Sequence, residues 1–563
     1  MLGNGGGQGI TSASEPQITA ALGGGSNNGP VTTDGTCGAT HGHCGVGCQS
    51  GQCDGAPVSG TSGPAPARKG TGAFFTVIGQ GGVPAMHAAL MPNGKVVFLD
   101  KVENYSQLRL RNGQYAYSAE FDSNTGQVAP LAYKTNAFCS GGTFLADGRL
   151  LNIGGNGPLS FFDPTVGDGF TGLRYLERSY SSGSLDGQDW SEPGNKTLPD
   201  GRVFVASGSL NGLDPTVRAN NNPTYEILSA QGISNGRNIP MALLERAQPY
   251  YMYPFIHTLR DGNLFVFASK SAQIFNVNNN AVVRELPDLP GEFRSYPNTG
   301  TSVLLPLSSS DGYTSRVLVC GGGAYQDISS PTDASCGRIV ADDPRAQWTL
   351  ESMPQGRVMV EGVLLADGKV LLINGANKGA QGFDLATDPT LTPLVYDPTA
   401  AQGQRFTEYP GSPIPRLYHS VALLLLDGTV LVAGSNPVEQ PLLQPNAQHP
   451  YVTEFRVERW VPPYLVGENA NRRPRNVRLS TRTVAPDTVY NVEFDTLNTS
   501  KHIKVVLYHG GFATHSLHMG QRMVFLDYSG FQAGAIHQNI RFRTPPRNTA
   551  QPGPWVIYIL GSL

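Results

Sequence analysis

Short apolar runs separated by polar turns recur along most of the chain, and their length predicts β-strands. Each repeat has an apolar run, a turn with Asp-Gly or Asn-Gly, and a second apolar run, as in LADGRLLNIGG and LLDGTVLVAGS. Asp-Gly and Asn-Gly are typical of tight hairpins, because both central positions favour positive φ. Seven such turns lie 50 to 61 residues apart, with the glycines Gly94, Gly148, Gly201, Gly262, Gly312, Gly368 and Gly428.

The repeat length indicates how these hairpins are assembled. A hairpin alone is marginally stable, so each unit needs further strands and neighbours. A period near 50 residues is typical of kelch blades, and seven units fit a closed propeller without free sheet edges. The alternative is an array of unrelated hairpins in a sandwich. We expect an all-β fold with a seven-bladed kelch β-propeller over residues 73–449.

The pattern changes after about residue 450. Strand-like runs at 489–494, 503–508 and 555–560 are separated by turns, without a kelch-type unit. About 110 residues of this kind predict an immunoglobulin-like β-sandwich. We therefore assign residues 450–563 to a C-terminal domain.

Composition and charge exclude several classes of protein. The chain has 563 residues, of which 69 are Gly, 42 are Pro and only 15% are charged, and its net charge is −3. So much Gly and Pro excludes a long helical protein. A nucleic-acid binder would show a basic excess. The longest apolar runs, such as 421–426, are too short for a transmembrane helix. We expect neither a nucleic acid nor a membrane as a partner.

The N-terminal residues differ in composition from the rest. Residues 1–73 are mostly Gly, Ser, Thr, Ala and Pro, and the first aromatic residue is Phe74. We expect residues 1–36 to be disordered and residues 54–72 to form a linker. Residues 1–21 lack the basic start and apolar core of a signal peptide. Either the chain is mature or its true start is missing.

Seven cysteines leave one unpaired. Cys320 and Cys336 form a local pair in a loop-rich stretch. Together with a cluster of four cysteines near the N-terminus they indicate disulfides and an oxidising compartment, so we expect a secreted protein. Cys139 remains as a free or modified thiol. The N-terminal cluster consists of Cys37, Cys44, Cys48 and Cys53.

The repeat also places residues with metal-binding chemistry at equivalent positions. The residue nine positions before a turn glycine begins the inner strand of a blade, near one end of the central channel. In the second, fourth and seventh repeats this residue is Cys139, Tyr253 and His419, and Tyr418 precedes the last of these. Imidazole and phenolate donors suit Cu(II). Tyr253 alone is more simply interpreted as an ordinary strand residue.

Several segments carry a resemblance to a known family. They occur in the expected order and blades from about residue 72 to the C-terminus: KTNAFCSGGTFLADGR, SGSLNGLDP, NNNPTYEIL, PRLYHSVALLL, VAGSNP and GFATHSLHMGQRMVFL. The chain resembles the copper radical oxidases, above all the fungal glyoxal oxidase branch, with galactose oxidase more distant. The resemblance implies a seven-bladed kelch propeller followed by an immunoglobulin-like domain. A hairpin of that last domain would reach the propeller axis and contribute a metal ligand.

The resemblance also implies which residues hold one copper ion. Tyr418 and His419 match the axial tyrosine and the first histidine, and His515 matches the histidine of the C-terminal domain. Cys139 matches the cysteine that forms a thioether with a second tyrosine. Three further histidines do not match and are interpreted as ordinary surface or strand residues: His502, His509 and His518.

In this family, copper carries one electron and the cross-linked tyrosyl radical carries a second. The resemblance therefore implies an enzyme that oxidises an aldehyde or a primary alcohol with O2 and releases hydrogen peroxide. Tyr418 would accept the substrate proton. Similarity to glyoxal oxidase favours small aldehydes of the glyoxal and methylglyoxal type. The alternative is a catalytically inactive kelch propeller that binds carbohydrate or a partner protein.

The chain departs from the family at the cross-linked tyrosine. The repeat places this residue nine positions before Gly201, where the chain has Glu192. Residues 190–199 contain no apolar run, so the third repeat lacks its first strand. Two explanations compete: a short segment is missing between Lys196 and Thr197, or the chain is a genuine inactive relative. We favour the first, and we expect this chain not to form the thioether.

The N-terminal cysteine cluster resembles a truncated hevein-type chitin-binding module at residues 37–53. It has four cysteines where that family has eight. Such modules hold sugars by stacking them on aromatic residues. Because the segment contains none, its sequence argues against chitin as a partner. The alternatives are a small disulfide knot, or a metal site that includes His41 and His43.

Overall fold

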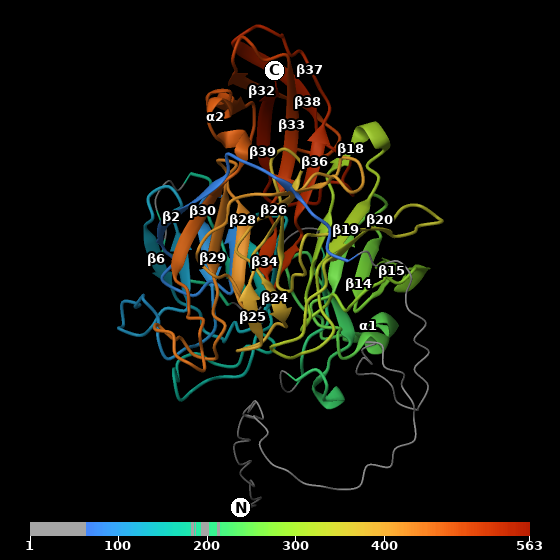
Figure 1. Cartoon of the computed structure of the whole chain (residues 1–563). Coiled ribbons are helices and arrows are strands. Elements are labelled where there is room, and N and C mark those ends of the chain that lie inside the picture. Colours follow the sequence, from blue (N-terminus) through green and yellow to red (C-terminus); the bar gives the residue numbers. More distant parts are fainter. Residues whose placement is uncertain (1–62, 182–184, 186, 193–201, 211–213, 563) are drawn as a thin grey trace, which may run out of the picture. The chain divides into compact units, whose positions relative to one another are not determined.

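The computed structural model describes residues 63–562, except 182–184, 186, 193–201 and 211–213. The expected disordered segment 1–36 and the cysteine cluster at 37–53 lie outside these residues. The regular elements of the described chain are almost all β-strands, joined by turns and loops, as predicted (Figure 1). None of the helices that the structure describes is long and apolar enough to cross a membrane. These helices are α1 (Ala242–Ala247), α2 (Glu468–Asn471) and the 3-10 turns η1 (Arg218–Asn220), η2 (Ser309–Asp311) and η3 (Pro463–Leu465).

The first sheet combines strands from both ends of the chain, in the order β35-β34-β3-β4-β5-β6. The hairpin β34–β35 pairs antiparallel with β3, with Thr514 opposite His87. A C-terminal hairpin thus joins the first repeat. The strands are β3 (His87–Leu90), β4 (Val96–Leu99), β5 (Ser118–Phe121), β6 (Val128–Leu131), β34 (Phe512–Thr514) and β35 (Leu517–Met519).

The second and third sheets each have three strands. The second comprises β7 (Gly141–Phe144), β8 (Leu150–Ile153) and β9 (Leu173–Leu176), and the third β10 (Val203–Ala206), β11 (Thr224–Leu228) and β12 (Ile239–Pro240). In the third sheet β10 pairs with β11, and the described residues place no strand on the other edge of β10. The expectation that the third repeat lacks its first strand concerns residues 190–199, of which 193–199 lie outside the described residues.

The other repeats form larger sheets. The fourth comprises β13 (Phe255–Thr258), β14 (Leu264–Ala268), β15 (Ser271–Asn276) and β16 (Ala281–Leu286), and the fifth β17 (Thr301–Leu304), β19 (Arg316–Cys320), β20 (Ser335–Val340) and β21 (Thr349–Ser352). The sixth comprises β22 (Glu361–Leu364), β23 (Val370–Ile373), β26 (Leu394–Tyr396), β27 (Phe406–Glu408) and β1 (Arg68–Lys69). The seventh comprises β28 (Ser420–Leu424), β29 (Val430–Gly434), β30 (Arg456–Val461) and β2 (Phe74–Gln80). A separate two-stranded sheet comprises β24 (Ala376–Gly379) and β25 (Ala386–Pro389).

The turn glycines behave as the sequence predicts. Six of the seven lie between paired strands and have φ between 66° and 92°, a conformation that glycine adopts without steric cost. The seventh, Gly201, lies outside the described residues. The inner strands they join are buried: β22, β23, β28 and β29 are buried along their whole length.

Cys320 and Cys336 form a disulfide between the neighbouring strands β19 and β20, where they lie directly opposite each other. Cys139 is a free cysteine. The expected local pair and the expected leftover thiol are therefore both present in the described chain.

The C-terminal residues form two further sheets, drawn mostly in red in Figure 1. One comprises β31 (Arg475–Leu479), β32 (Val489–Asp495), β38 (His537–Arg543) and β37 (Tyr528–Ser529), and the other β18 (Leu307–Ser308), β36 (Arg522–Leu526), β33 (His502–His509) and β39 (Val556–Ser562). Burial alternates along β38, and its apolar residues Ile540 and Phe542 share a core with Val505 and Val524 of the other sheet. Alternation of this kind is typical of a sandwich.

Candidate metal centre

Cys139, Tyr253 and His419 share one unusual backbone conformation. Their φ values are 55°, 50° and 59°, and they come just before β7, β13 and β28. Positive φ is uncommon for residues other than glycine. Ala85 and Met359, which also lie nine residues before a turn glycine, have φ values of 47° and 60°. The conformation therefore belongs to the repeat, and it confirms that the three residues occupy equivalent positions.

His515 reaches the same place from the turn between β34 and β35. Its Nε2 lies 3.5 Å from the Sγ of Cys139. One donor atom each from Cys139, His419 and His515 lie within 4.8 Å of one another. The structure thus brings together residues from the second repeat, the seventh repeat and the C-terminal region.

Tyr418 completes this group of side chains. Its ring stacks on that of His419, with centroids 3.7 Å apart, and it lies edge-on to His515 at 5.7 Å. Its side chain is buried, at 2% exposure. One phenol and two imidazoles therefore meet, which is a donor set suited to Cu(II).

The hydrogen bonding of His419 provides a test of whether a metal fits. Among the described residues, neither ring nitrogen of His419 has a hydrogen-bond partner, although the side chain is almost fully buried. Leaving a buried polar group unsatisfied costs about 1–3 kcal/mol. A metal ion bound by one of these nitrogens would relieve part of that cost. The donor set and the unsatisfied imidazole both fit copper.

Burial determines which side chains of this site are protonated. It lowers the pKa of His419 and of His515 well below the ordinary value, so both imidazoles stay neutral and keep a lone pair. Burial, and then the neighbouring Tyr296, raise the pKa of Tyr418. Burial raises the pKa of Cys139 to about 12. Tyr418 and Cys139 are therefore protonated until a cation binds beside them.

Tyr253 and Tyr296 line the group without joining the donor set. The Tyr253 ring stacks on His515 at 4.4 Å, and its hydroxyl donates to the Ser140 carbonyl at 3.2 Å. The Tyr296 hydroxyl lies 3.2 Å from the Tyr418 hydroxyl. Tyr253 was singled out by the repeat. Tyr296 was not, because it lies in a loop between β16 and β17 whose length follows no period.

Glu192, at the position expected for the cross-linked tyrosine, contacts residues outside the donor group. The Glu192 carboxylate accepts hydrogen bonds from the Lys134 amide at 2.5 Å and the Thr135 hydroxyl at 2.7 Å. A cavity of about 1160 Å³ lies beside Cys139 and is lined by β10 together with parts of β7 and β13. It lies between the inner strands of the second and fourth repeats. The described residues thus provide copper donors but no phenol at the expected thioether position.

The three histidines that did not match the family lie outside the donor group. His518 is buried and paired with Glu361 at 2.7 Å, His509 bonds to the Pro554 carbonyl at 2.7 Å, and His502 is exposed on β33. His518 is a buried strand residue rather than a surface residue.

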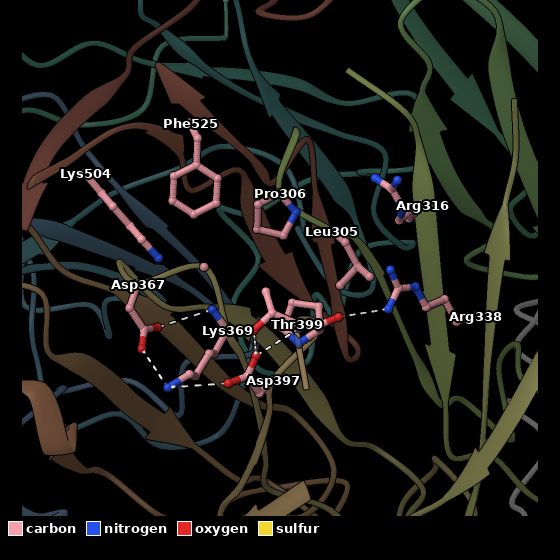
Figure 2. A pocket seen from close by; sticks show the side chains of 12 residues that line it. Leu305, Pro306, Arg316, Arg338, Asp367, Lys369, Asp397, Thr399, Lys504 and Phe525 are labelled. Atoms are coloured by element: carbon pink, nitrogen blue, oxygen red, sulfur yellow. Dashed lines mark hydrogen bonds and ion pairs between the residues drawn. The ribbon is translucent and has the colours of Figure 1, made fainter. Parts of the chain in front are cut away.

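A second cavity, of about 400 Å³, lies apart from these residues (Figure 2). Of its four cationic side chains, Lys369 and Arg316 have carboxylate partners, and that of Arg316 is Asp311. Lys369 contacts the carboxylates of Asp367 and Asp397 at 3.3 and 3.8 Å. Arg338 donates to the Pro398 carbonyl at 3.0 Å. The Nζ of Lys504 lies 5.4 Å from the centre of the Phe525 ring.

Comparison with known families identifies the family of this chain. The family model for the glyoxal oxidase N-terminus matches residues 86–464. The chain belongs to the glyoxal oxidase family. A second model, the galactose oxidase-like early set domain, matches residues 473–562 of this family member. The resemblance to copper radical oxidases is confirmed.

Named relatives of this glyoxal oxidase family member include plant and fungal oxidases. It is 34% identical to an aldehyde oxidase of Vitis pseudoreticulata, over 86% of this chain and 94% of that protein. It is 33% identical to an aldehyde oxidase of Arabidopsis thaliana, over 85% and 80%. It is 24% identical to a galactose oxidase of Gibberella zeae, over 85% and 67%.

One solved structure resembles the fold. It is a fungal alcohol oxidase of the AA5 family in complex with copper, with a TM-score of 0.56 and 16% identity, covering 87% of this chain and 97% of that one. This likeness supports the all-β architecture of the glyoxal oxidase family member.

Proposed function

We propose that this protein oxidises small aldehydes of the glyoxal and methylglyoxal type, or primary alcohols, and passes the electrons to O2 to give hydrogen peroxide. The observation that carries the proposal is the convergence of Cys139, His419 and His515 within 4.8 Å in a member of this family. The two named aldehyde oxidases among its relatives favour aldehydes over alcohols.

The proposed roles follow from the contacts of each residue. His419 and His515 hold the copper through neutral imidazoles, and Tyr418 is the third ligand. Copper bound there would supply one-electron redox chemistry. Tyr418 accepts the proton that the substrate loses, since it lies against both histidines and its buried oxygen has one neighbouring hydroxyl, that of Tyr296.

The cross-linked tyrosine does not fit the chain as it stands. Glu192 is bound to Lys134 and Thr135, and no strand of the described residues pairs with the edge of β10 opposite β11. We propose that a short strand-forming segment belongs between Lys196 and Thr197 in the natural protein. It would fill the cavity beside Cys139 and bring the missing phenol to this residue.

The test starts from the mature transcript across the codons for Lys196 and Thr197. We expect an inserted segment that encodes a tyrosine. Protein expressed from that transcript and loaded with copper should release peroxide with glyoxal and methylglyoxal, and a His515→Ala variant should release none. A continuous junction together with no peroxide would support the alternative of an inactive propeller that binds a carbohydrate or a partner.

The cellular location is part of the proposal. The Cys320–Cys336 disulfide favours an oxidising compartment. We propose that the protein is secreted, which detection of the enzyme in culture supernatant would test.

A further inference from the structure

A short chain of hydrogen bonds links the first repeat to His515. His87 lies on β3 and Thr514 lies opposite it on β34. The Thr514 hydroxyl is 2.6 Å from Nδ1 of His87 and 2.6 Å from Nδ1 of His515. All three side chains are at most 1% exposed. These contacts are therefore shielded from water and depend on one another.

The contacts of His87 determine which atoms donate and which accept along this series of hydrogen bonds. Nε2 of His87 lies 3.2 Å from the Ala137 carbonyl, which can only accept a hydrogen bond, and 3.2 Å from the Ser140 hydroxyl, which can accept or donate one. Burial lowers the pKa of His87 to about 3, so the ring is neutral and carries one N–H, and the carbonyl favours that N–H on Nε2. The opposite tautomer would place a bare nitrogen against the carbonyl oxygen. Nδ1 of His87 is then an acceptor.

The remaining protons follow from this assignment. The Thr514 hydroxyl has one proton and donates it to Nδ1 of His87. Its oxygen then accepts from Nδ1–H of His515. His515 carries its single proton on Nδ1, and its Nε2 keeps a free lone pair. This is the nitrogen that lies 3.5 Å from Cys139, within the donor group.

We propose that His87 is a positioning residue that acts through Thr514 to hold His515 in the tautomer and orientation that bind copper. This inference rests on the proposed metal site. Phe512 on β34 stacks on the His87 ring at 5.4 Å and fixes its plane. Removing such an outer partner of a metal-bound histidine typically weakens metal affinity by about 10- to 100-fold.

Two pairs of variants separate hydrogen bonding from packing. His87→Phe keeps a ring but removes both nitrogens, whereas His87→Asn keeps an acceptor close to the position of Nδ1. Thr514→Val keeps the shape but removes the hydroxyl, whereas Thr514→Ser retains it. The control is His509→Phe, because His509 also bonds to a backbone carbonyl but lies outside the donor group.

The readouts are copper affinity, measured by competition with a chelator, and the nitrogen couplings in the electron paramagnetic resonance spectrum of Cu(II). We expect about 10- to 100-fold weaker binding for His87→Phe and Thr514→Val. We expect near wild-type binding for Thr514→Ser and His509→Phe, and intermediate binding for His87→Asn. Thermal unfolding checks that each variant is folded.

The outcomes distinguish the two proposals. Wild-type protein that binds no copper overturns the metal site itself. Wild-type protein that binds copper with an affinity unchanged in folded His87→Phe and Thr514→Val overturns the role of His87. Nitrogen-15 spectra of histidine-labelled, metal-free protein, assigned with His515→Gln, give a direct reading. A proton on Nε2 of His515 would also overturn that role.

Discussion

The hydroxyl groups of Tyr296 and Tyr418 lie 3.2 Å apart, and both side chains are buried. Tyr296 comes from the loop before β17, and Tyr418 comes two residues before β28. A phenolate can only accept hydrogen bonds, so Tyr296 is the donor of this pair once Tyr418 binds a cation as phenolate. In the metal-free protein Tyr296 raises the pKa of Tyr418, but once a cation holds Tyr418 as phenolate, the Tyr296 hydroxyl can donate to that oxygen and stabilise its charge.

We predict that Tyr296→Phe weakens copper binding at pH 7 by about tenfold or more, because a hydrogen bond to a charged group contributes about 1.5–3 kcal/mol. Competition with a chelator measures the affinity, and the phenolate-to-copper absorption reports on Tyr418 directly. Tyr250→Phe is the control, since its hydroxyl contacts the Ala324 carbonyl at 3.2 Å, away from the donor group. Equal affinity in Tyr296→Phe and wild type would show that the pair does not support the site.

Copper should stabilise the fold, and His419 should be needed for this. A ligand at a hundred times its dissociation constant adds about 2.7 kcal/mol to the free energy of unfolding. We predict this gain for wild type, its reversal by a chelator, and its loss in His419→Ala. Chemical unfolding with and without copper measures it. His502→Ala, an exposed histidine on β33, should keep the gain. A similar gain in His419→Ala would place the copper elsewhere.

The repeat in the sequence located part of the site because the site is built on that repeat. Cys139, Tyr253 and His419 were found by counting back from turn glycines, and they share one backbone conformation. His515 lies beyond the repeat, so only the resemblance to a family pointed to it. Tyr296 and His87 were missed. Their roles depend on hydroxyl and imidazole contacts between segments that are distant in sequence, and no period records such contacts.

The fold followed more directly than the site, because turn chemistry and strand patterning are local properties. The all-β architecture and the local disulfide were both predicted. The lack of an apolar run before Gly201 predicts a missing strand beside β10, and residues 193–201, which would test this, lie outside the described residues. The expected domain boundary after residue 449 precedes β30, which pairs with β29 of the seventh repeat. Strand pairing of this kind depends on the tertiary fold.

The buried pair Glu120–Arg178 should make stability depend on pH. Arg178 Nε lies 3.0 Å from the Glu120 carboxylate, and both side chains are at most 1% exposed. Burial alone raises the pKa of Glu120, but hydrogen bonds from Asn93 and Arg178 outweigh it and lower that pKa below its usual value of 4.5. The ionised pair therefore contributes stability above pH 4.5, and this is lost as the pH falls through the native pKa.

We predict that Glu120→Gln lowers the free energy of unfolding by about 3–5 kcal/mol at pH 7, because it leaves the buried Arg178 without its charge partner. The difference from wild type should shrink below pH 4.5. Urea unfolding at several pH values measures both effects. Glu285→Gln, from the exposed pair with Arg246, should change stability by less than about 1 kcal/mol. A difference that stays constant with pH would contradict the assignment.

The last prediction concerns the sulfur of Cys139. The residue expected to supply its phenol is Glu192, which is bound to Lys134 and Thr135, and the cavity beside Cys139 holds no strand of the described chain. We predict that this chain, loaded with copper under O2, keeps Cys139 as a thiol. Intact mass should show no loss of two hydrogens, and thiol labelling should still modify Cys139 after unfolding.

The matched control is the protein with the segment between Lys196 and Thr197 restored, which should lose two hydrogens. Tyr253 and Tyr296 are the phenols most able to contradict this prediction, because both rings contact His515 beside the donor group. Peptide mapping that finds Cys139 joined to either of them, together with a radical absorption band, would contradict the prediction and show that the donor group builds its own cross-link.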